Sequence, residues 1–135
     1  PHGHRLSDRA KVPLRLLADE RFILFPRSHG SGFHDQIVSL CHLAGFSPKV
    51  VQEASQMQTI LSLVAAGIGV ALIPASVQSL RNEGIHYKPL RERASVTGIA
   101  LAWLLDSNSP VMDHFIEVAK EVARGGKTVG SKSVE

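Results

Sequence analysis

The sequence predicts an α/β fold, with a mostly parallel sheet covered by helices on both faces. Short, continuously apolar runs alternate along the chain with segments whose apolar residues recur at helical spacing. This alternation is typical of βαβ units, and continuous apolar runs are typical of strands that are buried on both faces. Ligands bind to such sheets outside the carboxyl ends of the strands, so a site is expected there.

Five apolar runs predict the strands. The first and third runs end at Pro26 and Pro74, and proline lacks the N–H that a central strand needs for pairing. The predicted strands are residues 21–25 (RFILF), 49–53 (KVVQE), 69–73 (GVALI), 85–87 and 96–104.

Five segments predict helices from their apolar spacing and their end signals. Gly45 and Gly67 follow the two central helices, where glycine commonly ends a helix. Ser55 and Gln58 have the spacing of a capping box, and residues 109–110 (SP) pair a cap residue with a first-turn proline. The predicted helices are residues 13–18, 32–44, 55–66, 75–80 and 110–123.

Composition narrows the possible functions. Hydrophobic residues make up 44% of the 135, enough for a packed core, and no apolar run approaches the length of a membrane span. The net charge is only +3, and no run of Lys or Arg reaches the density typical of nucleic-acid binding. Cys41 is the only cysteine, so no internal disulfide is possible, which agrees with a reducing cytosol.

The most informative local feature is the loop at residues 28–33 (SHGSGF). It follows a predicted strand and opens a predicted helix, and its glycines let the backbone approach a ligand closely. The free N–H groups of a first helical turn, with the helix dipole behind them, attract an anion such as a carboxylate. The alternative is an ordinary strand-to-helix turn in which Ser31 is only a cap.

A second feature, residues 54–58 (ASQMQ), lies at the next strand end and helix start. Gln56 and Gln58 could donate hydrogen bonds to a ligand there, and Met57 could supply an adaptable apolar contact. The two loops would then converge on one site. The alternative is that Gln58 merely completes the capping box.

Patterns that indicate enzymes, cofactors or metals fail on spacing. Residues 30–32 (GSG) lack the flanking residues of a nucleophile elbow, and residues 67–69 (GIG) precede a strand where a dinucleotide motif would follow one. His29 and His34 have no third ligand at a recognisable spacing. Cys41 lies near an apolar helix face, as a packed thiol does. We therefore expect no enzyme activity, no catalytic residue, no metal and no cofactor.

Three stretches together resemble the C-terminal effector-binding (substrate-binding) domain of LysR-type transcriptional regulators. They are LADERFILFPRSHGSGFHDQI, AGFSPKVVQEASQMQTILSLVAAGIGVALIPAS and ALAWLLDSNSPVMDHFIEVAKEV, and the resemblance covers about residues 4–123. It implies a fold like that of type 2 periplasmic binding proteins, in which a small effector binds between two α/β subdomains. The effector would then control the conformation of the DNA-bound regulator.

The resemblance also implies a division of the chain. Residues 1–12 would be a linker, and residues 13–103 would form the second subdomain. Residues 104–124 would return to the first subdomain as a segment and a helix, and residues 125–135 would be a disordered tail. DNA would be bound only through an N-terminal domain outside this chain, and a homodimer or homotetramer in the cytoplasm, without membrane association, is implied.

The resemblance implies a position for the effector: in family members that sense aromatic-pathway acids, the backbone at the matching helix start holds an effector carboxylate, and here that position is Ser31, Gly32 and Phe33. The other residues expected to line the site are Pro26, Arg27, Ser28, Met57, Gln58 and Pro74. A cationic Arg27 beside a helix N-terminus suggests an anionic effector. The alternative function is a periplasmic solute-binding protein of a transporter, which shares the fold.

Overall fold

The computed structural model of the chain describes residues 1–80, 83–92 and 109–125. The chain divides into two compact units, residues 1–98 and 99–135. The elements of the first unit are the 3-10 helices η1 (Leu14–Leu17), η2 (Arg27–His29) and η3 (Ala75–Ser79), the strands β1 (Arg21–Leu24) and β2 (Lys49–Glu53), and the helices α1 (Ser31–Leu43) and α2 (Met57–Ala65). The described part of the second unit contains α3 (Pro110–Gly125).

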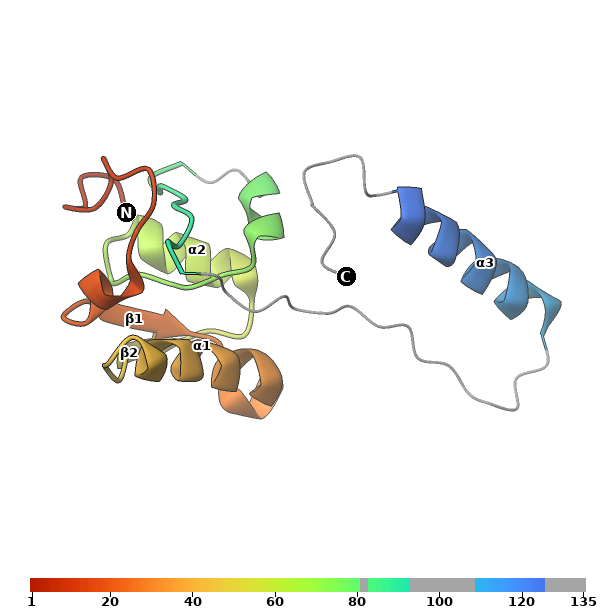
Figure 1. The fold of residues 1–135 in the computed structure, drawn as a ribbon, viewed down its shortest axis with the longest axis horizontal. Coiled ribbons are helices and arrows are strands. Elements are labelled where there is room, and N and C mark those ends of the chain that lie inside the picture. Colours follow the sequence, from red (N-terminus) through yellow and green to blue (C-terminus); the bar gives the residue numbers. More distant parts are fainter. Residues whose placement is uncertain (81–82, 93–108, 126–135) are drawn as a thin grey trace. The chain divides into compact units, whose positions relative to one another are not determined.

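The sheet of the first unit is parallel, as the alternating pattern predicts. β1 pairs with β2, from Arg21 opposite Lys49 to Leu24 opposite Glu53. On its other edge β1 forms a single parallel bridge, between Phe22 and Val70. The spatial order is therefore β2, β1 and then the segment around Val70. Parallel crossover connections are right-handed, and the two connections here run in opposite directions across the sheet, from β1 to β2 and from β2 back past β1 to the Val70 segment. The helices of these connections, α1 and α2, therefore lie on opposite faces of the sheet, as Figure 1 shows.

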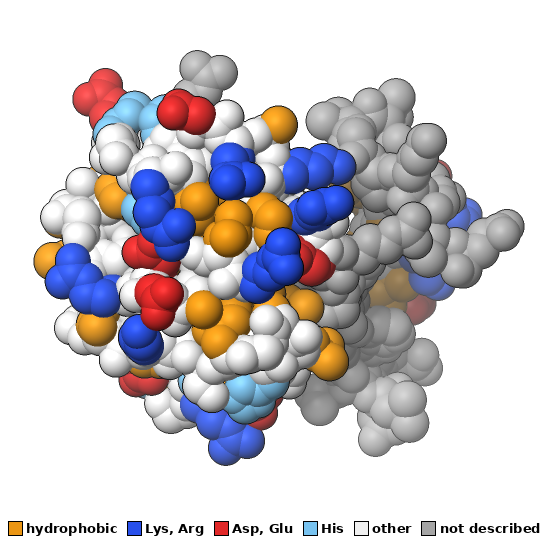
Figure 2. Space-filling model, turned by 60° about the vertical axis from the view of Figure 1, so that its left-hand side comes forward, with side chains coloured by type: hydrophobic (Ala, Val, Ile, Leu, Met, Phe, Trp, Pro, Cys, Tyr) orange, Lys and Arg blue, Asp and Glu red, His pale blue; other side chains and the backbone are white. Residues whose placement is uncertain are grey.

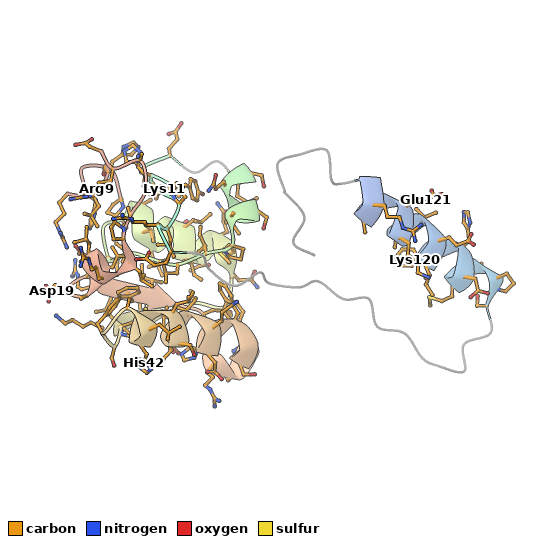
Figure 3. The ribbon with its side chains drawn as sticks, viewed as in Figure 1. Arg9, Lys11, Asp19, His42, Lys120 and Glu121 are labelled. Carbon is orange, nitrogen blue, oxygen red and sulfur yellow. The ribbon has the colours of Figure 1, made fainter. Side chains whose placement is uncertain are left out.

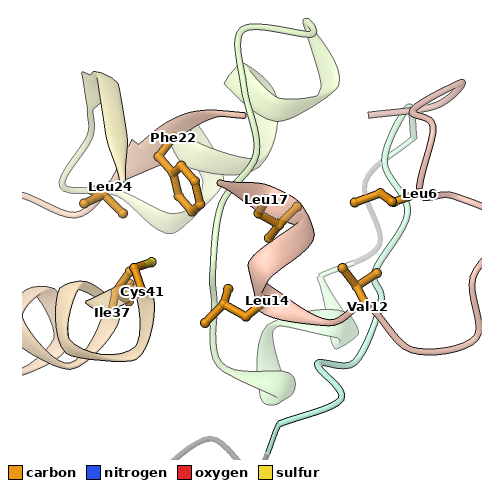
Figure 4. Close-up of a cluster of buried hydrophobic side chains, with 8 residues drawn as sticks. All are labelled: Leu6, Val12, Leu14, Leu17, Phe22, Leu24, Ile37 and Cys41. Carbon is orange, nitrogen blue, oxygen red and sulfur yellow. The ribbon is translucent and has the colours of Figure 1, made fainter. Parts of the chain in front are cut away.

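The core lies mainly between β1 and α1. Phe22 and Leu24 face the same side of β1 and pack in one cluster with Ile37 and Cys41 of α1 (Figure 4). Ile23 is equally buried but points to the other face, because side chains alternate along a strand. The remaining members of the cluster come from the N-terminal residues and η1: Leu6, Val12, Leu14 and Leu17.

Residues 1–12, expected as a linker, are attached to this unit by backbone and side-chain contacts. Val12 forms a parallel bridge with Leu90, and Leu6 and Val12 are each only 5% exposed. The guanidinium of Arg5 donates to the Glu20 carboxylate at 2.9 Å. This segment therefore contributes to the core of the unit.

Both long helices of the unit end in a closed C-terminal turn. The amide of Gly45 donates to the carbonyl of His42, and the amide of Phe46 donates to the carbonyl of Cys41, at 2.9 and 3.1 Å. This bond pair requires a left-handed residue, and Gly45 has a φ of +89°. Gly67 ends α2 with the same bond pair. The two predicted glycine stops are confirmed.

Some predicted elements are shorter than expected or absent. The strand over 69–73 is reduced to the bridge at Val70, whose amide and carbonyl pair with Arg21 and Ile23. A Cβ on Gly69 would overlap the carbonyl oxygen of Arg21, so the two backbones approach closely there. The strand over 85–87 is absent. The strand over 96–104 lies outside the described residues.

The prediction of a capping box at Ser55 and Gln58 is also wrong. α2 begins at Met57 with Gln56 in the cap position, and no side chain caps it. Ser55 lies one residue too early in the chain for its hydroxyl to serve as the cap. The predicted helices over 13–18 and 75–80 form as short 3-10 helices. The predicted strand over 49–53 also forms, although all five of its residues are exposed.

α3 is an amphipathic helix with an exposed apolar stripe. Val111, Phe115, Val118 and Val122 recur along one side and are between 42% and 79% exposed. Pro110 occupies the first position of the helix, as the Ser-Pro signal predicts. No helix of the described residues is long and apolar enough to cross a membrane.

Candidate functional site

The first candidate site is the α1 mouth, residues 26–33, where β1 leads through η2 into α1. Gly30 is the cap residue of α1, and the helix start has no side-chain cap. The amide of His34 reaches the carbonyl of Gly30 at 3.1 Å, whereas the three amides before it have no helical carbonyl ahead of them. Ser31 and Gly32 are exposed. The alternative interpretation, in which Ser31 caps the helix, is therefore wrong in that respect, and the first turn faces solvent.

An aromatic pair lies beside these amides. The rings of Phe25 and Phe33 meet edge to face with their centroids 6.3 Å apart. A Cβ on Gly30 would lie 3.0 Å from Phe25 Cε1, so only glycine fits this contact without a shift of the ring. The α1 mouth thus combines peptide N–H donors with an apolar wall, which suits an apolar or aromatic carboxylate.

The charged groups of the α1 mouth are paired. Arg27 donates from Nε and Nη2 to the two carboxylate oxygens of Asp35, at 2.8 and 3.0 Å. The His34 ring nitrogen Nδ1 lies 3.1 Å from Oδ1 of Asp35. The hydrogen bond from Arg27, with that from His34, lowers the pKa of Asp35 to about 2, and the same pairing raises the pKa of Arg27. The hydroxyl of Ser28 bonds the ring of His29 at 3.1 Å.

The other predicted site residues follow the neighbouring parallel segments. Met57 and Gln58 begin α2, just after the carboxyl end of β2, and the amide of Ala54 donates to the carbonyl of Leu24 at 3.1 Å. Pro74 ends the extended segment on the other side of β1. All three groups of predicted residues therefore lie at one edge of the sheet.

This edge contains a topological switch point. The chain leaves β1 through α1 to reach β2 on one side, and reaches the Val70 segment on the other side through α2. In parallel sheets ligands bind in the crevice outside the carboxyl ends of the strands, at the point where the strand order reverses, which here is between β1 and the Val70 segment. The α1 mouth and Pro74 flank that point, and Met57 and Gln58 lie one strand away.

Sequence patterns do not indicate the roles of Phe25 and Asp35. The apolar run RFILF predicts Phe25 as part of the strand, but β1 ends at Leu24 and the ring of Phe25 turns to Gly30. Asp35 is eight residues from Arg27, a spacing that brings them together only because η2 turns back over the first turn of α1. The acid in the second turn of the predicted helix is the one signal that could have pointed to this pair.

The α1 mouth is an open edge. A surface pocket lies elsewhere in the first unit, and none of the predicted site residues lines it. No group of three His, Cys, Asp or Glu side chains among the described residues is placed to hold a metal. Cys41 is fully buried, and burial raises its pKa to about 11, as expected for a packed thiol.

Basic side chains are dispersed. Figure 2 shows Lys and Arg interspersed with acidic and apolar groups on the face drawn. In Figure 3 Arg9 and Lys11 are labelled in the upper part of the first unit and Asp19 at its left edge. This distribution agrees with the absence of a basic run in the sequence.

The fold and the open edge define an α/β ligand-binding unit of parallel topology, and known proteins give its family. The LysR substrate binding domain model matches residues 1–124. The chain is 39% identical over 114 residues to the HTH-type transcriptional regulator IlvR of Caulobacter vibrioides, which covers 83% of this chain and 38% of that protein. It is 29% identical to the HTH-type transcriptional regulator AlsR of Bacillus subtilis, over 88% of this chain and 39% of that protein.

Solved structures show the same relationship. HinK, a LysR family transcriptional regulator from Pseudomonas aeruginosa, aligns with a TM-score of 0.70 at 25% identity, over 90% of this chain and 42% of its own. The BenM effector binding domain with its effector benzoate aligns with a TM-score of 0.65 at 26% identity, over 98% of this chain and 61% of its own.

The chain belongs to the LysR substrate binding domain family, and the predicted resemblance and fold class are confirmed. Its curated relatives are transcriptional regulators, which supports the regulator interpretation over the transport protein. The chain spans about two fifths of the length of these two relatives.

Proposed function

We propose that this chain is the effector-sensing part of a LysR-type regulator and that it binds a small carboxylate at the α1 mouth. One observation carries the proposal: the uncapped first turn of α1 lies at the switch point of a parallel sheet, beside an aromatic pair. The proposed ligand residues are Pro26, Arg27, Ser28, Ser31, Gly32, Phe33, Met57, Gln58 and Pro74.

The chemistry at the α1 mouth is recognition by backbone amides. A carboxylate at a helix N-terminus gains about 0.3–1 kcal/mol from the dipole, and up to about 2 when partly buried. The amides of Ser31, Gly32 and Phe33 would donate to its oxygens, while the rings of Phe25 and Phe33 would contact its apolar part. BenM binds benzoate, a ligand of this chemistry, which supports the choice of an aromatic acid.

The mechanism is a change in the orientation of two subdomains. The effector would bridge residues 13–103 and a first subdomain, of which this chain supplies only the return segment at 104–124. A ligand that prefers one orientation shifts the population toward it, by no more than its differential affinity for the two states. The exposed stripe of α3 supports this proposal, since an amphipathic helix is stable when another surface covers its apolar side.

The remaining features of the proposal follow from the family. The regulator would act in the cytoplasm, would bind DNA only through an N-terminal domain, would catalyse no reaction and would need no cofactor. It would assemble as a homodimer or homotetramer. β2 supports an assembly of copies, because it is an edge strand in the part described and exposes Val50 and Val51 at 44% and 45%.

The test removes one amide without removing the helix. Proline is tolerated at the first helical position, so Ser31→Pro deletes one N–H donor, whereas Ser31→Ala deletes only the hydroxyl. In the full-length regulator we expect Ser31→Pro to weaken benzoate binding about ten- to a hundredfold by calorimetry, in line with the loss of one charge-assisted hydrogen bond. Ser31→Ala should bind within about twofold of the natural protein, since the amide that binds the carboxylate remains.

Two outcomes contradict the proposal. Equal affinities of Ser31→Pro and the natural protein would move the ligand away from the first turn of α1. Tight 1:1 binding of benzoate to the isolated 135-residue chain would contradict the need for a second subdomain, because one wall of the pocket should bind weakly or not at all.

A further inference from the structure

One ion pair crosses the α1 mouth. Arg27 belongs to η2, before the first turn of α1, and Asp35 belongs to the second turn. Two hydrogen bonds, of 2.8 and 3.0 Å, join the Nε and Nη2 edge of the guanidinium to both carboxylate oxygens. A two-point pair of this kind fixes the plane of the guanidinium and occupies the edge that would otherwise grip another carboxylate.

The pair lies close to the proposed ligand amides. Ser31 and Asp35 are four residues apart, so they lie on the same face of α1, one above the other. The side chains of Arg27 and Asp35 are 68% and 47% exposed, so a ligand in the α1 mouth can reach them. His34, 17% exposed, holds Oδ1 of Asp35 from the other side.

We propose that Asp35 is a specificity-determining, positioning residue of the effector site, which makes the site prefer an effector with one carboxylate over an effector with two. It does so by occupying Arg27 and by placing its own negative charge beside the α1 mouth. This inference rests on the proposed function, since it concerns the same site.

The physical reason lies in which donors remain free. No acidic residue lies in the first turn of α1, so a single carboxylate meets amides for which no side chain competes. A second carboxylate would find the two-point edge of Arg27 already occupied. It would also meet the charge of Asp35, whose carboxylate is ionised at neutral pH and is held in place by its hydrogen bonds to Arg27 and His34. Like charges at such short range repel.

The experiment compares benzoate with phthalate, its analogue with a second, adjacent carboxylate. Calorimetry on the full-length regulator gives the ratio of phthalate to benzoate affinity for the natural protein, Asp35→Asn and Asp35→Ala. We expect both substitutions to raise that ratio about three- to fivefold, a modest change because solvent screens the charges of an exposed pair. In Arg27→Gln/Asp35→Asn the ratio should fall back toward the natural value, because the released cation is gone.

Asp19→Asn is the matched control. Asp19 forms an exposed ion pair of 3.3 Å with Lys49 in the same unit. Figure 3 shows Asp19 beyond the far end of α1, on the side of His42 in its last turn. Its substitution removes the same charge from a different place and should leave the ratio unchanged. Thermal unfolding of all variants shows whether they are folded.

The outcomes separate the inference from the proposed function. An unchanged ratio in Asp35→Asn and Asp35→Ala, with benzoate still bound, overturns the role of Asp35 and leaves the effector site in place. A raised ratio that persists in full in the double variant shows that release of Arg27 takes no part, and a raised ratio that Asp19→Asn reproduces shows a general charge effect. Either result also overturns the inference. If neither acid binds to any variant or to the natural protein, the carboxylate site itself fails, and the inference with it.

Discussion

The helix ends at the two edges of the parallel sheet differ in whether their free backbone groups are hydrogen-bonded. At the edge where the strands begin, α1 and α2 end in glycine turns at Gly45 and Gly67, whose amides and those of the next residues satisfy the last carbonyls. At the edge where the strands end, the same helices begin at Ser31 and Met57 with no side-chain cap. At both edges the helix ends have backbone groups without partners inside the helix. Only at the edge where the strands end do these groups, the N–H donors of the first turns, lack a side-chain cap.

The difference indicates which edge is structural and which is available to a ligand. Relative to a good Ser, Thr, Asp or Asn cap, a helix start without a side-chain cap costs about 0.5–2 kcal/mol, but only a few tenths of a kcal/mol where glycine is the cap, as Gly30 is for α1. Serines lie at or near both helix starts, at Ser31 and Ser55, yet neither occupies the cap position. Uncapped starts at a switch point agree with donors that a carboxylate can use, which the proposed function requires.

The largest effect on stability is expected for Gly69→Ala, at the edge where the strands begin and the helices end in glycine turns, which we call the closed edge. The added Cβ would overlap the carbonyl oxygen of Arg21, which is backbone and cannot rotate away. The pairing of Val70 with β1 must then shift, at a cost of about 1–3 kcal/mol, typical of forced overpacking. Urea denaturation measures the loss. A variant as stable as the natural protein would show that the close approach of the two backbones is not required.

A somewhat smaller effect is expected for Gly45→Ala. Nothing lies within 4 Å of the added methyl, so the whole effect comes from the left-handed backbone at a φ of +89°. A left-handed alanine costs about 1–2 kcal/mol. Gly45→Asn, which tolerates this conformation better, should recover part of the loss. Equal denaturation midpoints for Gly45→Ala and the natural protein contradict the strain argument.

The same substitution at the open edge should act in the opposite direction. Gly32 is helical, has no positive φ, and nothing lies within 4 Å of an added Cβ. Gly32→Ala should therefore stabilise the protein by about 0.5–1 kcal/mol through reduced freedom of the unfolded chain. If the α1 mouth holds the effector, the new methyl should also weaken benzoate binding to the full-length regulator. A gain in stability with unchanged binding would separate this edge from the ligand.

The sequence predicted which segments form helices and strands better than it predicted which neighbours these segments contact. The apolar runs and glycine stops located β1, β2, α1 and α2, because periodicity and backbone freedom are properties of local sequence. The exposure of β2 was not predictable in this way. Val50 and Val51 resemble core residues, and only their position in an edge strand leaves them exposed. The length of the strand at Val70 likewise depends on the neighbour it meets.

The candidate site divides in the same way. Ser31, Gly32 and Phe33 could be proposed from a strand-loop-helix pattern, because a first helical turn always presents free amides. Asp35 could not, because its bond to Arg27 depends on how η2 folds back over α1. The position of the Phe25 ring beside Gly30 could not be predicted either. The strand ends one residue before the apolar run does, and the pattern gives no sign of that.

The smallest predicted effect is on stability at acidic pH, and it also distinguishes the two edges of the sheet. Because the pKa of Asp35 is lowered to about 2 in the folded protein, below its usual value near 4, its pairing stabilises the fold above pH 4. That contribution is lost as the pH falls from about 4 to about 2, because protonation breaks the pair with Arg27. The difference in unfolding free energy between the natural protein and Asp35→Asn should therefore shrink over that range. A difference that stays constant from pH 5 to pH 2 contradicts the pairing. The glycine variants of the closed edge carry no titrating group, so their effects should not change with the protonation of Asp35.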